Sequence, residues 1–319
     1  MKISLLAAAM LFAQAAAANE YSAPLKAHKY AEVERIANAK LAQDPANAEA
    51  MAAKIEAILP AGRYDEGAKL GEQCIAAHPQ VSNCHLWFGN ALGTRAMSVG
   101  IMAAIGSAGT IRDAFKKAVE LDPQNVDARM SLLTFYMQAP SIAGGGKGKA
   151  QTLTQQTASV NPDAAKVMQA RLDASDDKIS KAEAAVLAMP VSANEQVADA
   201  QRDMLNNLGS YYLNEKKYGD SERLYREALK RFPDSDGAMY GLARVHQEQG
   251  KHRESIAAMV QVIALNPRAG AHYRIGQSLL ALGEKAKAAA AYEKALTYKT
   301  GLSSKMKADA EDQLKTLKR

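Results

Sequence analysis

The sequence predicts an all-α chain in which antiparallel helix pairs stack into a solenoid. The first observation is the spacing of the prolines, since Pro45 and Pro79 lie 34 residues apart, as do Pro233 and Pro267. Each of these prolines closes a short apolar helix pattern, as expected for repeated helix–turn–helix units. The second observation is that no stretch shows the apolar–polar alternation of a half-buried strand. Stacked units of this kind present a concave surface, so the predicted activity is binding.

Residues 1–18 are predicted to be a secretory signal peptide. Lys2 supplies a positive charge, residues 3–13 form an apolar segment too short to span a bilayer, and small residues precede the expected cleavage after Ala18. The mature chain would then begin at Asn19 and lie in the bacterial periplasm or beyond it, with no membrane span left after cleavage. An uncleaved anchor is the alternative.

Residues 19–199 are predicted to be degenerate helical repeats, with insertions near 91–110 and 139–149. Apolar patterns typical of a unit's second helix precede four of the prolines, namely Pro45, Pro79, Pro123 and Pro162. The segment from Asp163 to Pro190 is helical in pattern but shorter than one repeat. Ser192 with Glu195 is a capping-box signature and predicts a helix that starts near Ala193 and runs into the next unit.

Residues 200–302 contain three regular copies of the repeat. The first copy carries Leu208-Gly209 and Tyr212 on one helix, then Tyr225 and Ala228 on the next, and ends at Pro233. The second and third copies place similar residues at nearly the same offsets. This pattern resembles the tetratricopeptide repeat family, which implies a superhelix of helix hairpins that binds peptides or protein subunits.

Residues 303–319 are predicted to form a capping helix at the C-terminal end of the repeats. Apolar residues recur on one face of this segment, and lysines and acidic residues occupy the other. The apolar positions are Met306, Ala310, Leu314 and Leu317. Such a helix would cover the last repeat and offer a polar outer face to solvent.

The candidate partner-binding surface is a polar stripe along the first helices of the three regular repeats. Within each helix, members that lie three or four residues apart share one helix face. The members are Asn206, Ser210, Asn214, Tyr240, Arg244, Gln247, Tyr273, Arg274 and Gln277. Some members of the resembled family grip a C-terminal carboxylate with Lys and Asn on such a stripe, whereas this chain offers Asn206 and Arg274 without the full set. The alternative is that these residues are only solvated.

Cys74 and Cys84 are predicted to form a disulfide. Cys74 lies near the end of one second helix and Cys84 near the start of the next first helix, so the break at Pro79 brings them close. An oxidising compartment permits the bond. The alternative is a pair of buried free thiols. No metal site is expected, because Cys84 and His85 are adjacent and no second ligand pair has metal spacing.

The first insertion is almost wholly apolar between residues 96 and 110. It is predicted either to lengthen a helix pair that packs on its neighbours or to expose an apolar face for self-association or partner capture. Residues 84–145, from Cys84-His85-Leu86-Trp87-Phe88-Gly89 through the insertion to Leu121-Asp122-Pro123, also resemble the tetratricopeptide region of the regulator-of-microtubule-dynamics family. That resemblance implies shared repeat geometry and no catalytic signature.

The second insertion contains a glycine-rich loop, residues 144–149. A phosphate-binding loop would need Ser or Thr after the last lysine and a strand before it, whereas Ala150 follows here. The favoured interpretation is a flexible turn between two helices. The alternative interpretation is that glycines and backbone amides at the start of a helix hold an anion here. The whole chain would then be a small-molecule or anion-binding protein that uses this loop.

Composition and motif spacing argue against catalysis and against nucleic-acid binding. The formal net charge is only +6 and is spread along the chain, so no nucleic-acid partner is expected. The six histidines are scattered and are not spaced with acids or cysteines as a catalytic constellation. We therefore expect neither a catalytic residue nor a cofactor. Asp176 and Asp177 are expected to flank a helix, because neighbours on a helix point apart.

Overall fold

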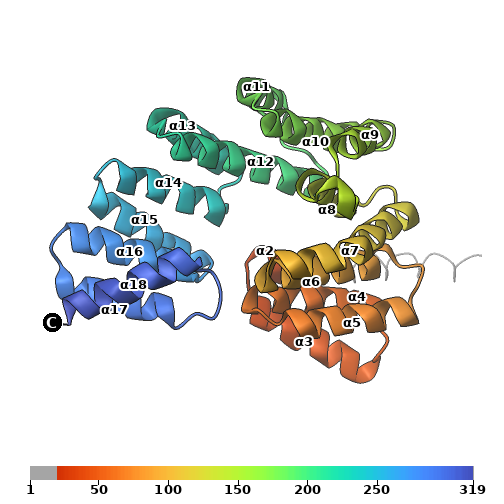
Figure 1. Cartoon of the computed structure of the whole chain (residues 1–319), viewed down its shortest axis with the longest axis horizontal. Coiled ribbons are helices and arrows are strands. Elements are labelled where there is room, and N and C mark those ends of the chain that lie inside the picture. Colours follow the sequence, from red (N-terminus) through yellow and green to blue (C-terminus); the bar gives the residue numbers. More distant parts are fainter. Residues whose placement is uncertain (1–19, 319) are drawn as a thin grey trace, which may run out of the picture. The chain divides into compact units, whose positions relative to one another are not determined.

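The computed structural model describes residues 20–318, which form helices joined by short turns (Figure 1). These residues contain no strand, in agreement with the predicted all-α solenoid of helix pairs. The chain divides into two compact units, Met1–Ser107 and Ala108–Arg319, and each is described by itself. The signal peptide predicted for residues 1–18 lies outside the described residues.

The first unit packs its helices in sequence order, α3 on α4, α4 on α5 and α5 on α6. Its elements are α2 (Ser22–Lys26), α3 (Tyr30–Gln43), α4 (Ala48–Ile58), the short 3-10 helix η1 (Leu59–Ala61), α5 (Tyr64–Ala77) and α6 (Ser82–Val99). Helices α5 and α6 approach closely at Gly71, where an added Cβ would lie 2.8 Å from the Cα of Phe88. The helix α7 (Ile101–Leu121) begins in this unit and ends in the second.

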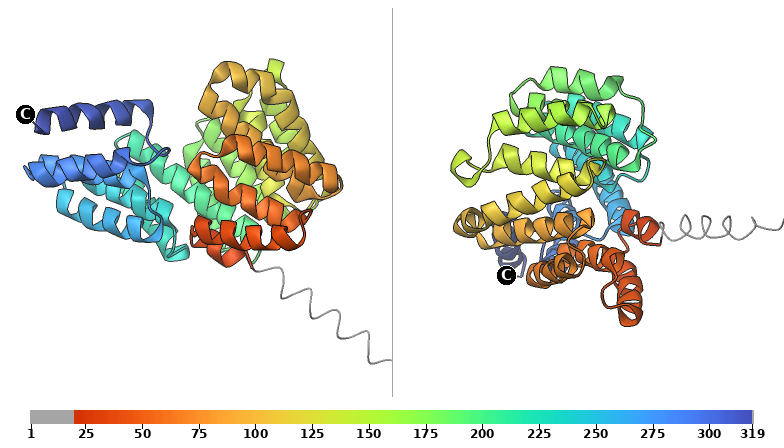
Figure 2. Two further views of the ribbon diagram at one scale, coloured as in Figure 1. Left: turned by 90° about the horizontal axis from the view of Figure 1, so that it is seen from below. Right: turned by 90° about the vertical axis from the view of Figure 1, so that its right-hand side faces the viewer.

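The second unit continues the same succession of pairs (Figures 1 and 2). The elements before the regular repeats are α8 (Val126–Gln138), the 3-10 helix η2 (Ser141–Ala143), α9 (Lys147–Ala158), α10 (Pro162–Ser175) and α11 (Ile179–Ala188). The regular repeats are the pairs α12 (Glu195–Asn214) with α13 (Tyr218–Arg231), α14 (Asp236–Glu248) with α15 (His252–Leu265), and α16 (Ala269–Ala281) with α17 (Lys285–Leu296). The last element is α18 (Ser304–Leu317).

Local sequence explains where the first helices begin. Two residues after a proline, Asn47, Asn125 and Ser235 each accept a hydrogen bond from the backbone amide three residues later, at 3.0–3.3 Å. A side-chain acceptor at this position satisfies an amide that the helix itself cannot pair. The proline therefore ends one helix, and the residue two positions later caps the next.

The turn inside each regular pair holds one residue in the left-handed conformation, at Lys216, Gly250 and Gly283. These positions lie 34 and 33 residues apart, so the backbone repeats as the sequence does. The following amides bond back to the first helix, for example Lys251 to the carbonyl of His246 at 2.8 Å. This arrangement closes the first helix and aims the chain into the second.

Helix α18 covers the last pair, as the sequence predicts for a cap (Figure 2). Its half-buried Met306, Leu314 and Leu317 pack on a core that contains Tyr292. Ala310 is fully buried in the same cluster. The polar side of the helix stays exposed, which is what the end of a repeat stack requires.

Two details differ from the sequence-based expectations. The segment from Asp163 to Pro190 forms a complete helix pair, α10 and α11, because α11 has only 10 residues and Asp177 makes the left-handed turn between the two helices. Helix α12 is capped by Asn194, whose side chain accepts from the amide of Val197 at 3.1 Å. The helix starts at Glu195, close to the expected Ala193, and continues through Leu208 as expected, but its cap is Asn194 and Ser192 accepts from the amide of Asn194 instead.

Cys74 and Cys84 form the predicted disulfide, with their Cα atoms 5.3 Å apart. Both residues are fully buried, and they cluster with Met51 of α4. The bond joins α5 to α6 across the proline break.

Candidate functional site

The polar stripe begins on α12 with Asn206, Ser210 and Asn214. The Asn206 amide nitrogen donates to Ser235 at 3.4 Å, and its Oδ1 is buried with no partner within the described part of the chain. Ser210 shares a 2.9 Å hydrogen bond with the hydroxyl of Tyr225. Asn214, near the end of α12, is exposed. On α12 the stripe therefore offers the side-chain amide of Asn206 and the exposed Asn214 at the C-terminal end of the helix.

On α14 the stripe presents an aromatic ring and a guanidinium group. Tyr240 is half-buried, and the guanidinium of Arg268 lies 5.4 Å from the centre of its ring. Arg244 lies one helical turn beyond Tyr240, and its Nε is buried without a hydrogen-bond partner among residues 20–318. A buried donor without an acceptor costs free energy comparable to a lost hydrogen bond, about 1–3 kcal/mol.

Gln247 and the α16 members of the stripe are joined in one network. The Arg274 Nη1 donates to Gln247 at 3.1 Å and to Gln277 at 3.3 Å, and the Gln247 amide nitrogen donates to the Arg274 carbonyl oxygen at 3.0 Å. Gln277 in turn donates to the Tyr273 hydroxyl at 2.8 Å. The Arg274 Nε remains buried without a partner within the described residues.

Tyr273 sits deeper than the other members. It is 5% exposed, and its hydroxyl donates to Asp309 of α18 at 2.7 Å. Burial, followed by this hydrogen bond to a carboxylate, raises the pKa of Tyr273 well above its ordinary value. Tyr273, through Asp309, and Gln247, through Arg274, therefore hold α16 in place between α14 and α18.

The stripe on α12 extends further than the sequence reasoning found. Asp199 and Asp203 precede Asn206 at the same three- and four-residue intervals, so they share its helix face. Asp199 pairs with Arg202 at 2.7 Å. Asp203 is 63% exposed, and its carboxylate lies 3.8 Å from Arg202. Extending the spacing rule towards the N-terminus of α12 would have found both carboxylates.

The glycine-rich loop uses its own amides. The backbone nitrogens of Gly144, Gly145 and Gly146 donate to carbonyl oxygens of Ser141, Pro140 and Tyr136 at 2.8–3.1 Å. Lys149 donates to the Gly144 carbonyl at 2.9 Å. An anion-binding loop needs free amides that converge on the ligand, and these three are occupied by the chain itself.

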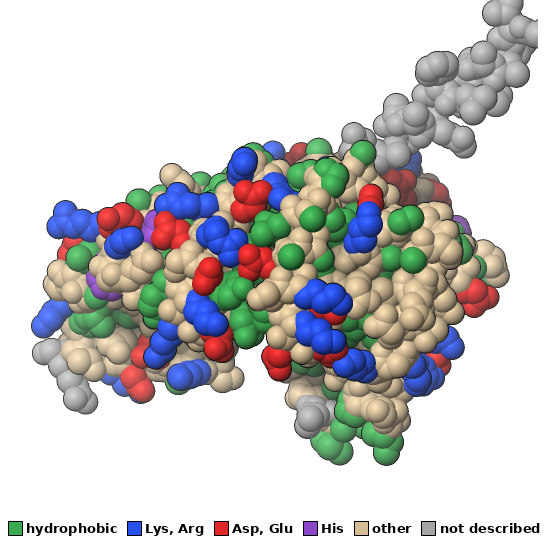
Figure 3. Space-filling model, turned by 90° about the horizontal axis from the view of Figure 1, so that it is seen from above, with side chains coloured by type: hydrophobic (Ala, Val, Ile, Leu, Met, Phe, Trp, Pro, Cys, Tyr) green, Lys and Arg blue, Asp and Glu red, His purple; other side chains and the backbone are tan. Residues whose placement is uncertain are grey.

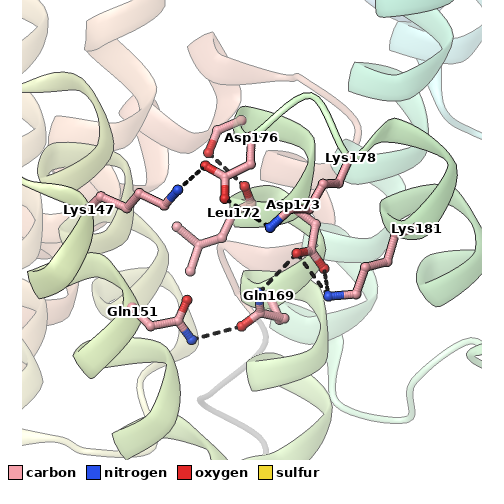
Figure 4. A network of polar contacts seen from close by, with 9 residues as sticks. Lys147, Gln151, Gln169, Leu172, Asp173, Asp176, Lys178 and Lys181 are labelled. Atoms are coloured by element: carbon pink, nitrogen blue, oxygen red, sulfur yellow. Dashed lines mark hydrogen bonds and ion pairs between the residues drawn. The ribbon is translucent and has the colours of Figure 1, made fainter.

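The lysine at the start of α9 joins a structural cluster between α9, α10 and α11 (Figure 4). Lys147 pairs with Asp176 at 2.6 Å, and Asp173 pairs with Lys181 at 3.0 Å. The hydrogen bond from Lys147 lowers the pKa of Asp176. Asp176 follows the C-terminus of α10, so it flanks a helix as predicted and is not half of an acid pair. The geometry therefore does not favour the anion-binding alternative.

Among residues 20–318, no three His, Cys, Asp or Glu side chains converge in a way that could hold a metal ion. Within the same range, no helix combines the length and the apolar character that crossing a bilayer requires.

Comparison with known proteins identifies the repeats. Residues 206–252 and 240–302 match the family model described as tetratricopeptide repeat. No curated protein matches the chain. The similarity to the regulator-of-microtubule-dynamics family therefore stays a prediction.

Among solved structures, yeast Tom70 shares the fold. Yeast Tom70 superposes with a TM-score of 0.62 at 11% identity, over 92% of this chain and 59% of that one. The Cut9–Hcn1 hetero-tetramer of the APC/C gives a TM-score of 0.48 at 16% identity, over 95% of this chain and 57% of that chain. A tetratricopeptide repeat protein from Parabacteroides merdae gives 0.43 at 15% identity, over 94% and 97%.

This chain spans less than two thirds of the length of the first two solved structures. The family match covers the three helix pairs that carry the polar stripe. Residues 206–302 of this chain are tetratricopeptide repeats.

Proposed function

We propose that this protein is an exported periplasmic scaffold that binds a peptide segment or a protein subunit along the polar stripe of α12, α14 and α16. It acts by binding and has no catalytic step of its own. The observation that carries the proposal is the polar stripe itself, on which three buried atoms, Asn206 Oδ1, Arg244 Nε and Arg274 Nε, have no hydrogen-bond partner within residues 20–318. These atoms lie on three successive first helices.

The charges of the stripe suggest the polarity of its partner. Asp199 and Asp203 lie at one end of α12, whereas Arg244 and Arg274 lie on the next two first helices. A segment that carries a cation at one end and a carboxylate at the other would match this order, since guanidinium–carboxylate hydrogen bonds are strong and directional. Half-buried Tyr240 adds contact area at low cost in conformational entropy.

Site-specific photo-crosslinking in the exporting cell tests the proposal. A photoreactive residue at Asn214, exposed on the stripe, is compared with one at Gln261, exposed on the second helix α15. A partner that crosslinks at position 214 but not at 261, and that is lost in Arg244→Ala, supports binding along the stripe. Equal crosslinking at both positions contradicts it. The control Arg253→Ala removes an exposed arginine from α15.

Export is tested on the same samples. Recovery of the protein in the periplasmic fraction with Asn19 as its first residue supports the proposed cleavage after Ala18. The proposal also allows self-association through residues 96–110, which sedimentation equilibrium of the purified protein would detect.

A further inference from the structure

The two long helices α6 and α7 meet at Gly100, and large apolar side chains on either side of it face solvent. Met97 is 75% exposed, Val99 71%, Met102 79% and Ile105 47%. A group of hydrophobic side chains protrudes at the lower edge of the surface in Figure 3. We call these four side chains the apolar junction. The insertion has thus lengthened a helix pair and has also left an apolar surface exposed.

We propose that the apolar junction inserts shallowly into the surface of an anionic phospholipid bilayer. The first support is the absence of charge, because residues 96–111 are sixteen consecutive residues without Asp, Glu, Lys or Arg. Desolvating a charge is the main cost of entering the apolar part of a bilayer.

The hydroxyl groups beside the junction are already satisfied. Thr94 donates to the carbonyl of Asn90 at 2.8 Å, and Ser98 donates to the carbonyl of Arg95 at 2.7 Å. Unsatisfied donors are costly in lipid, where no water replaces the lost partner. These two side chains can therefore approach the acyl region without leaving a donor unpaired.

The position of Arg95, the charged residue that precedes the junction, limits how deeply the junction can enter the bilayer. Arg95 precedes the last residue of α6 by four positions, which is about 6 Å along the helix at ~1.5 Å per residue. Interfacial helices bury their apolar face about 5–10 Å into the boundary between headgroups and acyl chains. Arg95 would then lie level with the phosphates. Its partner Asp65 is 85% exposed, and exposed ion pairs are weak, so exchange for a phosphate costs little.

The charge of the two helices fits an anionic surface. The first charged residue on either side of the junction is basic, Arg95 on α6 and Arg112 on α7. Each pairs with an exposed carboxylate, Asp65 and Asp113. Basic residues near an anionic surface contribute to membrane attraction. The amides in the first turn of α7 also lack acceptors within their helix, so they favour the headgroup region over the hydrocarbon.

The size of the junction favours lipid over a second copy of the chain. A stable protein interface uses roughly 20–30 residues on each side. The junction offers four large apolar side chains around one turn. Lipid needs no complementary shape, and the flexible methionines adapt to such an environment.

Vesicle flotation tests the proposal with protein purified from the exporting cell, every variant having the same N-terminus by mass. The vesicles contain phosphatidylethanolamine and phosphatidylglycerol. The double variant Met97→Gln with Met102→Gln keeps side-chain length and helix propensity at exposed sites, so folding is preserved. The matched control is Ile142→Gln with Val260→Gln, which removes two other exposed apolar side chains, 94% and 55% exposed.

We expect wild type and control to float with the vesicles, and the partition coefficient of the Met97/Met102 variant to fall at least tenfold. Absence of flotation for the wild type overturns the proposal, as does equal flotation of the Met97/Met102 variant. Sedimentation equilibrium of the same samples tests whether a second copy of the chain, and not lipid, covers the apolar junction. A wild-type dimer that the Met97/Met102 variant loses, without vesicle binding, makes the junction a self-association surface and overturns lipid insertion.

Discussion

The ring of Tyr225 lies against Gly241 of the next repeat, in a gap that leaves no room for a methyl group. A Cβ at Gly241 would overlap the ring, and one at Gly209 would lie 2.8 Å from its Cε1 and Cζ atoms. Tyr225 is 1% exposed, so it cannot move into solvent. We predict that Gly241→Ala lowers the free energy of unfolding by about 1–3 kcal/mol through overpacking, as measured by urea denaturation.

The control for this variant is Gly219→Ala in α13. Nothing lies within 4 Å of an added Cβ at Gly219, and the residue is exposed. Alanine has the higher helix propensity, so Gly219→Ala should leave stability unchanged or raise it by up to about 1 kcal/mol. Equal effects of the two substitutions would show that the contact between Tyr225 and Gly241 does not constrain the packing of the repeats.

The disulfide between Cys74 and Cys84 should stabilise the first unit. It closes a loop with a sequence separation of 10. In the chain-entropy model such a loop contributes roughly 2–3 kcal/mol by restricting the unfolded chain. The double variant Cys74→Ser with Cys84→Ser should therefore unfold at lower urea concentration, and adding a reductant to it should have no further effect. A wild-type protein whose stability is unaffected by reductant would contradict the prediction.

The fold could be predicted from the sequence because several positions of the repeat accept only one or two residue types. Pro233 and Pro267 cannot continue a helix interior, and Gly209 is required by the ring above it. The left-handed turns were harder to see, because Lys216 and Asp177 occupy positions where Gly250 and Gly283 give a clear signal. The hydrophobic pattern of the sequence does not indicate where a residue other than glycine adopts the left-handed conformation.

The candidate site was less predictable because surface exposure depends on neighbouring elements. The spacing rule placed Tyr273 and Arg274 together on α16, yet one is buried beneath α18 and bonded to Asp309 while the other reaches Gln247 on α14. Adjacent residues on a helix point in different directions. Only the packing of the cap decides which of the two remains accessible.

Tyr212 should make the stability of the second unit sensitive to alkaline pH. Burial and a 2.8 Å hydrogen bond to Glu183 raise the pKa of Tyr212 to about 12. The ordinary value near 10 applies to the unfolded chain. Because the folded state holds the proton more tightly, this contribution to stability is complete below pH 10 and is lost as the pH rises towards 12.

We predict that Tyr212→Phe lowers stability at pH 8 by about 1 kcal/mol, the net value of one hydrogen bond. Between pH 10 and 12 the variant should lose less stability than the wild type, because the phenylalanine ring cannot ionise. Urea denaturation at pH 8, 10 and 11.5 measures both effects. Tyr211→Phe, on the neighbouring residue, controls for general removal of a tyrosine, and parallel pH profiles for wild type and Tyr212→Phe would refute the role of this hydroxyl.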